Sequence, residues 1–199
     1  MKEMTLKEIQ NLLGYEVKII AEGTQRRLAD INTGETFNIG DLEFIILEHH
    51  NGETSVLLKD FWNVDIFDNN TNNYADSKIR KNLNNEFYKK IKSFIGENNI
   101  ILHSVDLTSD DGRKDYGMIK DYVSLLTCDL YRKYVDIIDK YRIKNNWWWL
   151  ATAYSTKSNS YISFVRCVNS DGVLDYDFYF NNNIGVRPFC IFKSDIFVS

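Results

Sequence analysis

The spacing of hydrophobic residues predicts three helices. The first opens with TLKE at residues 5–8, a capping-box pattern followed by apolar residues at helical spacing as far as Gly14. The second runs from Ser77, a candidate N-cap, to Gly96, with an apolar face made of Ile79, Leu83, Phe87, Ile91 and Phe94. The third is capped by Thr127 or Asp129, and its expected inward residues are Leu130, Tyr134, Ile137, Ile138 and Tyr141.

Strands joined by turns are predicted for much of the remaining chain. Residues 15–20 (YEVKII) read as one strand, and residues 26–61 read as several. Their clearest hairpin signal is Asn51-Gly52 between two apolar runs, because a tight primed turn needs positive φ angles. Further strands are expected at 99–107 (NIILHSVDL), 123–126 (VSLL), 161–168 (YISFVRCV), 173–180 (VLDYDFYF) and 185–192 (GVRPFCIF).

Two segments lack this periodicity and are predicted as loops. Residues 62–76 hold few apolar anchors and four asparagines in five positions, so we expect them to lie over the surface. Residues 108–117 (TSDDGRKDYG) form the second, polar loop. Asp110, Asp111 and Asp115 are candidate cation ligands in it, but their spacing does not match an EF-hand, and a capped turn is the favoured interpretation.

Three adjacent tryptophans, Trp147, Trp148 and Trp149, lie in the sequence NNWWWLATAYS. On a strand Trp147 and Trp149 share one face and Trp148 takes the other, so both faces need cover. The run predicts either a doubly buried central strand, which we favour, or half of an aromatic ligand platform.

Composition indicates a folded protein of one domain. The chain has 199 residues, of which 44% are hydrophobic and 26% charged. We expect a main domain at 23–199 and an appendage of helix and strand at 1–22. A net charge of −4 argues against bulk binding to nucleic acid or anionic membranes. With neither a long apolar run nor the apolar core of a signal peptide, a cytoplasmic protein is expected, or a virion-associated one if phage-encoded.

Candidate catalytic and metal-binding groups are sparse. Cys128, Cys167 and Cys190 are widely spaced, which predicts reduced, buried thiols rather than a disulfide framework or zinc site. His49 and His50 are adjacent and would face opposite ways on a strand, and His103 is interpreted as a core histidine. No local pattern pairs a nucleophile with a base, so we predict no catalytic residue, metal or cofactor.

Several segments, in order, resemble one family: GETFNIGDLEFIILE, SKIRKNLNNEFY, VDLTSDDGRKDYG, VSLLTCDLYRKYVDII, WWWLATAYS and GVRPFCIF. They are similar to the domain of unknown function 6273, found in Gram-positive bacteria and their prophages, over residues 34–192. The tryptophans followed by a Gly-Val-Arg-Pro strand are more distantly similar to the C-type-lectin-like fold of formylglycine-generating enzymes and phage receptor-binding proteins. This resemblance implies one compact α+β domain of mostly antiparallel strands with two main helices.

The chain departs from these relatives in two ways. Ala153 stands where proline usually follows WWLAT, which leaves the next loop less rigid. The catalytic cysteine pair of formylglycine-generating enzymes has no counterpart, because Cys167 and Cys190 do not sit in a matching motif. The resemblance therefore implies the fold without that activity.

A recognition module without catalytic activity is the function that we expect. Residues 153–183 are rich in Tyr, Ser, Asn, Asp and Phe, the residues of antibody-like binding surfaces. In a lectin-like arrangement this region would present a surface to a protein or glycan through Tyr154, Asn159, Tyr161, Tyr176, Tyr179, Asn181 and Asn183. The alternative interpretation is ordinary hairpins with half-buried tyrosines.

Arg187, in GVRPF, is expected to act with the tryptophans as a structural anchor. We favour a pair between its guanidinium and a buried carboxylate, and the alternative is that it fixes an acidic ligand. Homo-oligomerisation stays open.

Two other functions remain alternatives. One is an enzyme distantly related to sulfatase-modifying oxidases that uses Cys167 or Cys190. The other is a phage protein that modulates host defence or binds nucleic acid through the basic residues of the predicted helix at 77–96: Lys78, Arg80, Lys81, Lys89, Lys90 and Lys92. A solvated helix face is the simpler explanation of these charges.

Overall fold

The structure, a computed structural model, describes residues 25–199. The predicted helix at 5–14, the strand at 15–20 and the appendage at 1–22 lie outside the described residues. The rest is an α+β fold of mostly antiparallel strands with two main helices, as expected.

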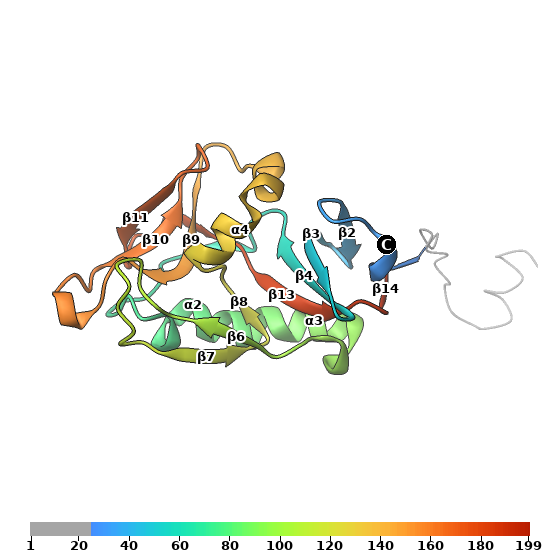
Figure 1. Cartoon of the computed structure of the whole chain (residues 1–199), viewed down its shortest axis with the longest axis horizontal. Helices are drawn as coiled ribbons and strands as arrows, with labels where there is room; N and C mark the ends of the chain where they lie inside the picture. Colours follow the sequence, from blue (N-terminus) through green and yellow to red (C-terminus); the bar gives the residue numbers. More distant parts are fainter. Residues whose placement is uncertain (1–24) are drawn as a thin grey trace, which may run out of the picture.

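Two five-stranded sheets lie one after the other along the long axis of the molecule (Figure 1). The first has the order β2 (Thr36–Ile39), β3 (Leu42–His50), β4 (Glu53–Leu58), β13 (Phe189–Lys193) and β8 (Val123–Ser124). The second has the order β11 (Leu174–Phe178), β10 (Phe164–Val168), β9 (Trp147–Ala153), β12 (Ile184–Val186) and β5 (Asn63–Val64). Within both sheets every pair is antiparallel except β12 with β9.

Two small strand pairs and several helices complete the fold. The pairs are β1 (Arg26–Arg27) with β14 (Phe197–Val198), and β6 (His103–Asp106) with β7 (Met118–Asp121). The first main helix is α2 (Lys78–Asn82), a π-helical turn η3 (Leu83–Phe87) and α3 (Tyr88–Ile95), and the second is α4 (Cys128–Ile138). Short 3₁₀ turns are η1 (Leu28–Asp30), η2 (Tyr74–Asp76), η4 (Glu97–Asn99), η5 (Asp139–Tyr141) and η6 (Lys157–Asn159).

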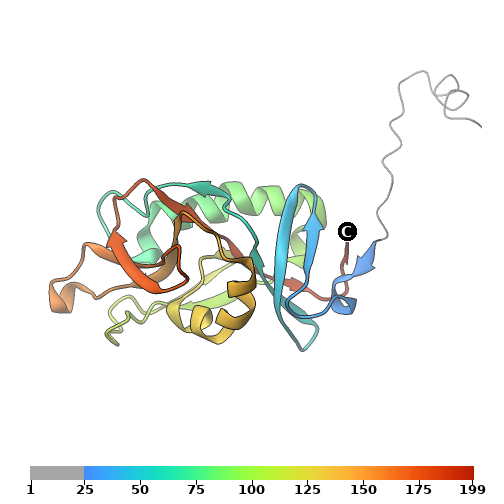
Figure 2. The same cartoon turned by 90° about the horizontal axis from the view of Figure 1, so that it is seen from above.

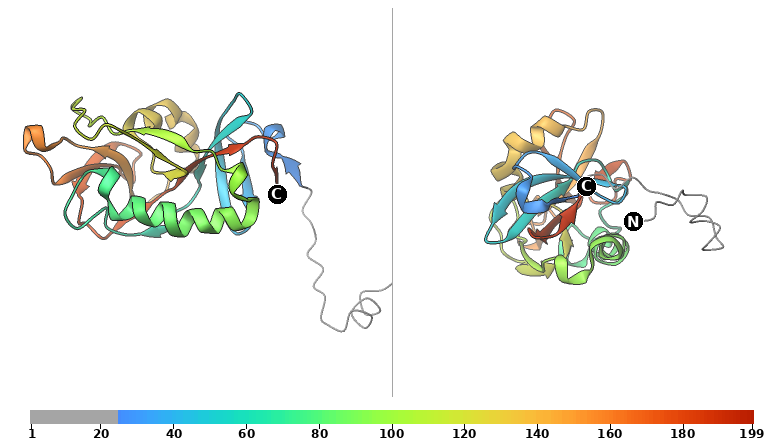
Figure 3. Two further views of the ribbon diagram at one scale, coloured as in Figure 1. Left: turned by 90° about the horizontal axis from the view of Figure 1, so that it is seen from below. Right: turned by 90° about the vertical axis from the view of Figure 1, so that its right-hand side faces the viewer.

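The first main helix runs along both sheets and joins them into one body (Figure 3). Ser77 is its N-cap, with its side chain accepting from the backbone N–H of Arg80 at 3.2 Å. The apolar residues of the predicted face are buried as far as Ile91, but Phe94 is half exposed and lies over Gly40. A Cβ at Gly40 would come within 2.4 Å of that ring, so only glycine allows the contact.

Helix α4 covers part of one face of the second sheet. Thr127, not Asp129, caps it, accepting from the N–H of Leu130 at 3.2 Å. Its buried side chains include Tyr131, Tyr134 and Ile138, whereas Leu130, Ile137 and Tyr141 of the predicted set are half-buried.

The tryptophan run forms the central strand β9, and its side chains alternate as predicted. Trp149 is completely buried in the larger core with Trp147 packed beside it, and Trp148 is buried in the second core beneath α4. The indole Nε1 of Trp149 donates to the carbonyl of Asp65 at 2.9 Å, so its polar atom is satisfied inside the core.

The prediction of a surface loop at 62–76 is wrong in one respect. The segment is mostly irregular, but Phe67 and Tyr74 are 0% exposed and belong to the main core. Asn72 is also buried, and its amide donates to the carbonyls of Ser155 and Phe164 at 2.8 and 3.0 Å. Two buried rings and one buried amide, which contact residues far away in the sequence, therefore hold this segment against the core.

The prediction of one strand at 185–192 is also wrong, because the chain changes sheets in its middle. β12 pairs with β9 and β5 in the second sheet, and β13 pairs with β4 and β8 in the first. Arg187 and Pro188 form the crossing. Arg187 is 0% exposed, and its Nε donates to the carbonyl of Leu58 at 2.8 Å.

Candidate functional site: an aromatic face and an adjoining pocket

Strands β10 and β11 hold their aromatic side chains on one side of the second sheet. Phe164 lies opposite Phe178, and Arg166 lies opposite Tyr176. The backbone hydrogen bonds between the two strands are made by the residue pairs that alternate with these. For example, the N–H of Tyr179 donates to the carbonyl of Ser163, and the N–H of Asn169 donates to the carbonyl of Val173. Phe164 with Phe178 and Arg166 with Tyr176 are therefore non-hydrogen-bonded pairs, in which side chains approach most closely.

The rings touch one another in an unbroken series. Their centroids are separated by 6.1 Å from Tyr161 to Tyr154, 5.0 Å from Tyr154 to Tyr176, and 5.2 Å from Tyr176 to Phe164. From Phe164 to Phe178 the separation is 4.6 Å, and from Phe178 to Phe180 it is 5.0 Å. We call this set the aromatic face: Tyr154, Tyr161, Phe164, Tyr176, Phe178 and Phe180.

Four of these six residues are about half exposed to solvent. The exposed fraction is 54% for Tyr161, 46% for Tyr176, 43% for Phe178 and 54% for Phe180. The face lies at the end of the molecule away from β14, where β10 and β11 close the sheet (Figure 1). Contiguous exposed apolar side chains are uncommon on monomeric proteins and mark interaction surfaces.

Arg166 joins the aromatic face to α4. Its guanidinium carbon lies 4.8 Å from the ring centroid of Tyr154 and 5.8 Å from that of Tyr176. Its Nε donates to Asp110 Oδ2 at 3.0 Å, while Arg132 Nη2 donates to Asp110 Oδ1 at 2.8 Å. Burial alone would raise the pKa of Asp110, but the bonds from the two arginines outweigh it and hold that pKa below its ordinary value.

A pocket of about 430 Å³ adjoins Asp110 and Arg132 at the start of α4. That volume lies in the range of small-molecule sites, ~300–1,000 Å³. Nine of its fifteen lining residues carry a hydroxyl group or a carboxylate: Ser104, Asp106, Thr108, Ser109, Asp110, Ser124, Thr127, Asp129 and Thr152. Such a wall donates and accepts hydrogen bonds in many directions.

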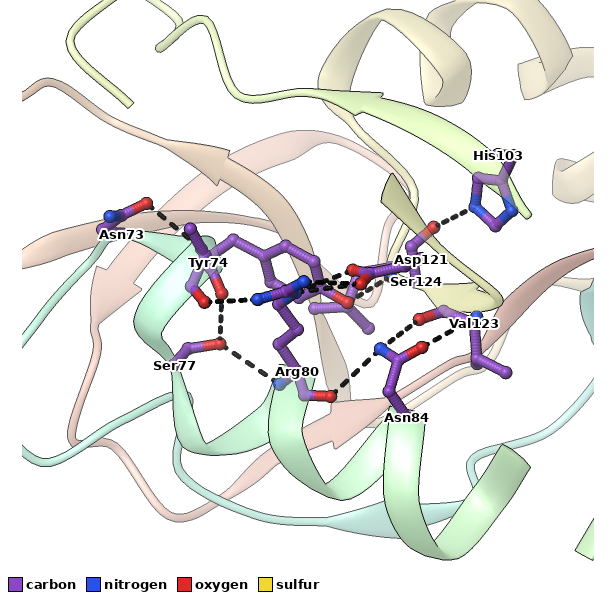
Figure 4. Close-up of polar contacts among 11 residues, drawn as sticks. Asn73, Tyr74, Ser77, Arg80, Asn84, His103, Asp121, Val123 and Ser124 are labelled. Carbon is purple, nitrogen blue, oxygen red and sulfur yellow. Dashed lines mark hydrogen bonds and ion pairs between the residues drawn. The ribbon is translucent and has the colours of Figure 1, made fainter. Parts of the chain in front are cut away.

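The imidazole of His103 and the thiol of Cys128, which also line the pocket, are both uncharged near pH 7. Burial lowers the pKa of His103 to about 4, and its Nε2 lies 2.9 Å from the hydroxyl of Ser124 (Figure 4). Burial raises the pKa of the Cys128 thiol to about 11. The imidazole and thiol therefore act as hydrogen-bonding groups in the wall.

A partly buried ion pair between Arg80 and Asp121 ties α2 to β7, the partner strand of β6 (Figure 4). Arg80 Nε donates to both oxygens of Asp121, at 3.0 and 2.9 Å, and Nη2 donates to Oδ1 at 2.8 Å. Asp121 is 3% exposed, and its bond raises the pKa of Arg80. Beside it the amide of Asn84 donates to the carbonyl of Val123 at 2.8 Å, so η3 is fixed to β8, the strand that carries Ser124.

The candidate cation ligands of the loop at 108–117 accept hydrogen bonds from other side chains: Asp110 from the two arginines, and Asp111 and Asp115 from hydroxyl groups. Asp111 accepts from Ser109 and from Ser155, the latter at 2.7 Å, and its pKa falls to about 2 because of these bonds. Asp115 accepts from Thr156 and Ser158. This loop is thereby tied to the loop after β9. Within residues 25–199, no group of three or more His, Cys, Asp or Glu side chains is placed to hold a metal ion.

Three of the seven predicted ligand-binding residues come together on the aromatic face: Tyr154, Tyr161 and Tyr176. Tyr179 adjoins the face, because its ring centroid lies 5.4 Å from that of Phe180, and the remaining three are asparagines. Tyr179 packs against the main core, Asn159 and Asn181 donate to Asp111 and Asp177, and Asn183 is exposed beyond β11.

The sequence interpretation missed Phe164, Arg166, Phe178 and Phe180. The sequence did contain a signal for them, because strand residues two positions apart share a face. Phe164 and Arg166 have this spacing, and so do Tyr176, Phe178 and Phe180. The pocket had no such signal, since its wall is assembled from separate elements.

The cysteines and basic residues on which the two alternative functions depend are mostly buried or already in ion pairs. All three cysteines are buried, and burial raises the pKa of Cys167 and Cys190 well above the ordinary range. On the basic helix Lys78, Arg80, Lys90 and Lys92 are in ion pairs with carboxylates. In the described part of the chain every helix is too short or too polar to cross a lipid bilayer.

Comparison with known proteins identifies the family. Searches of curated proteins and of solved structures gave no significant match. A family model described as "Domain of unknown function (DUF6273)" matches residues 51–194, which hold β4, both main helices, the tryptophan strand and the aromatic face. The chain thus belongs to the DUF6273 family.

Proposed function

We propose that this protein is a non-catalytic recognition module that binds a protein ligand through the aromatic face. The single observation that carries the proposal is the unbroken series of six rings, four of them about half exposed. Exposing this much aromatic surface to water costs free energy that a binding partner would recover.

The chemistry of the face favours a protein over a glycan. Phe178 and Phe180 have no polar atoms in their side chains, and both are exposed. Arg166 between the tyrosines adds a cation that is already paired with Asp110. Aromatic residues and arginine are enriched in the cores of protein interfaces, where they carry most of the binding energy.

We expect the partner to bind to the aromatic face and not to the free edge of β11. The outward N–H groups of Tyr176 and Phe178 donate to the side chains of Asp175 and Asp177, at 2.9 and 2.6 Å. Charged side chains that occupy edge groups in this way hinder the addition of another strand.

The finer parts of the proposal come from the resemblance. A C-type-lectin-like scaffold would present this region as its ligand-binding surface, and a prophage of a Gram-positive host is the proposed origin. The partner would then be met in the cytoplasm or, for a virion component, after lysis.

Phe178→Ser tests the proposal, with Phe197→Ser as the matched control. Phe197 is 58% exposed and lies in β14, at the opposite end of the molecule. Immobilised wild type and Phe197→Ser should capture the same host protein, identified by mass spectrometry, while Phe178→Ser should lose most of it at an unchanged melting temperature.

Equal capture by the two variants would overturn the proposal. A partner released by neutral oligosaccharides would assign the face to a glycan, and self-association abolished by Phe178→Ser would assign it to a homo-oligomer. Either result would also reject the proposed protein ligand.

A further inference from the structure

The guanidinium of Arg187 lacks the buried carboxylate that the sequence predicts for it. Its Nε donates to Leu58, but Nη1 and Nη2 have no hydrogen-bond partner among residues 25–199. No carboxylate of these residues lies within 4.0 Å of it, although Asp60 acts on it from farther away. The expected ion pair is therefore wrong.

Arg187 nevertheless keeps its charge inside the fold. Burial lowers the pKa of the guanidinium to about 10, which leaves it protonated near pH 7. The ring of Trp148, 5.1 Å from the guanidinium carbon, compensates part of the charge by a cation–π contact. A ring face cannot accept the N–H groups of both Nη atoms, which need acceptors in the plane of the guanidinium.

A small cavity lies beside this guanidinium. Trp148, Tyr131 and Arg187 contribute to its wall, together with Arg142, Asn169 and Gly172. Its volume is about 10 Å³, and a cavity needs roughly that much space to hold one water-sized occupant. The space is therefore of the order of one water molecule or one small monatomic anion.

The polar groups around the cavity favour an occupant that only accepts hydrogen bonds. The carbonyl of Gly172 already accepts from Tyr131 at 2.6 Å, and the amide oxygen of Asn169 accepts from two backbone N–H groups at 3.0 Å. The carboxylate of Asp139, also in the wall, is paired with Arg142. The charged side chains of the wall thus sum to one net positive charge.

We propose that Arg187 forms the buried base of a site for a small monovalent anion of chloride size, between Trp148, Tyr131 and the end of α4. The anion would accept from the two Nη groups, neutralise the charge at the crossing between the sheets and stabilise the fold. This site is separate from the aromatic face and does not depend on the function proposed for it.

The test compares thermal unfolding in sodium chloride and sodium gluconate at equal ionic strength, because gluconate is too large for the cavity. For the wild type we expect chloride to raise the midpoint by about 2–4 °C when its concentration is several times its Kd. Arg187→Met should abolish this difference, whereas Arg113→Met, which removes a half-exposed arginine, should retain it.

A crystal of the wild type grown in sodium bromide gives an independent result should Arg187→Met fail to fold. An anomalous peak within hydrogen-bond distance of Nη1 or Nη2 is expected. The proposal is overturned if only water occupies the cavity, or if chloride and gluconate give the same midpoint for the wild type.

Discussion

At the scale of single residues, the local sequence predicts which side of a strand a side chain takes, but not which distant residue it contacts. The alternation of Trp147, Trp148 and Trp149 is a property of any strand, so the sequence predicted which indoles share a face. The partner of Arg187 was not predictable in the same way. Its one acceptor, Leu58, lies 129 residues earlier in the chain.

Asp111 provides a test at this scale through pH. Its pKa is lowered to about 2 by bonds from Ser109 and Ser155. Because the folded-state pKa lies below the ordinary value, the stability from these bonds is fully present above about pH 4 and is lost as the pH falls toward 2. Asp111→Asn should therefore flatten the loss of stability between pH 4 and 2, measured by urea unfolding at each pH.

Ser155→Ala is the control for that experiment. It removes one of the donors to Asp111 at 2.7 Å and keeps the carboxylate, so it should reduce the same acid-dependent loss only in part. If Asp111→Asn and the wild type lose stability in parallel, these bonds do not fix the pKa of Asp111.

Helix ends and turns were predictable from the sequence where the residues that determine them lie within a few positions of one another. The N-caps Ser77 and Thr127 and the turn at Asn51-Gly52, with φ of 51° and 80°, follow from side chains within a few residues. The division of 185–192 into β12 and β13 has no local signal. It depends on β4, β5, β8 and β9, which draw the two halves into different sheets.

Thr127→Ala tests the cap of α4. The variant leaves the N–H of Leu130 without its side-chain acceptor, and we expect the free energy of unfolding to fall by about 1 kcal/mol. Thr127→Ser keeps the hydroxyl and should stay within a few tenths of a kcal/mol of the wild type. Urea unfolding followed by circular dichroism measures both, and equal losses in the two variants would contradict the assigned cap.

The complete fold brings into contact residues that are far apart in the sequence. Seen from above, α4 lies between the two sheets on the side opposite the first main helix (Figure 2). It covers Trp148 and stops short of the aromatic face, where Arg132 and Arg166 meet at Asp110. Composition indicated a binding region at 153–183, but only the register of β10 and β11 selects which of its rings share a face.

At the scale of the whole molecule we propose that the aromatic face binds a protein. The most direct measurement is the dissociation constant of the captured, purified partner for the wild type, Tyr176→Ser and Phe197→Ser. We predict that Tyr176→Ser weakens binding at least about tenfold, a change of ~1.4 kcal/mol or more, and that Phe197→Ser leaves it unchanged. Equal dissociation constants for the wild type and Tyr176→Ser would contradict the account.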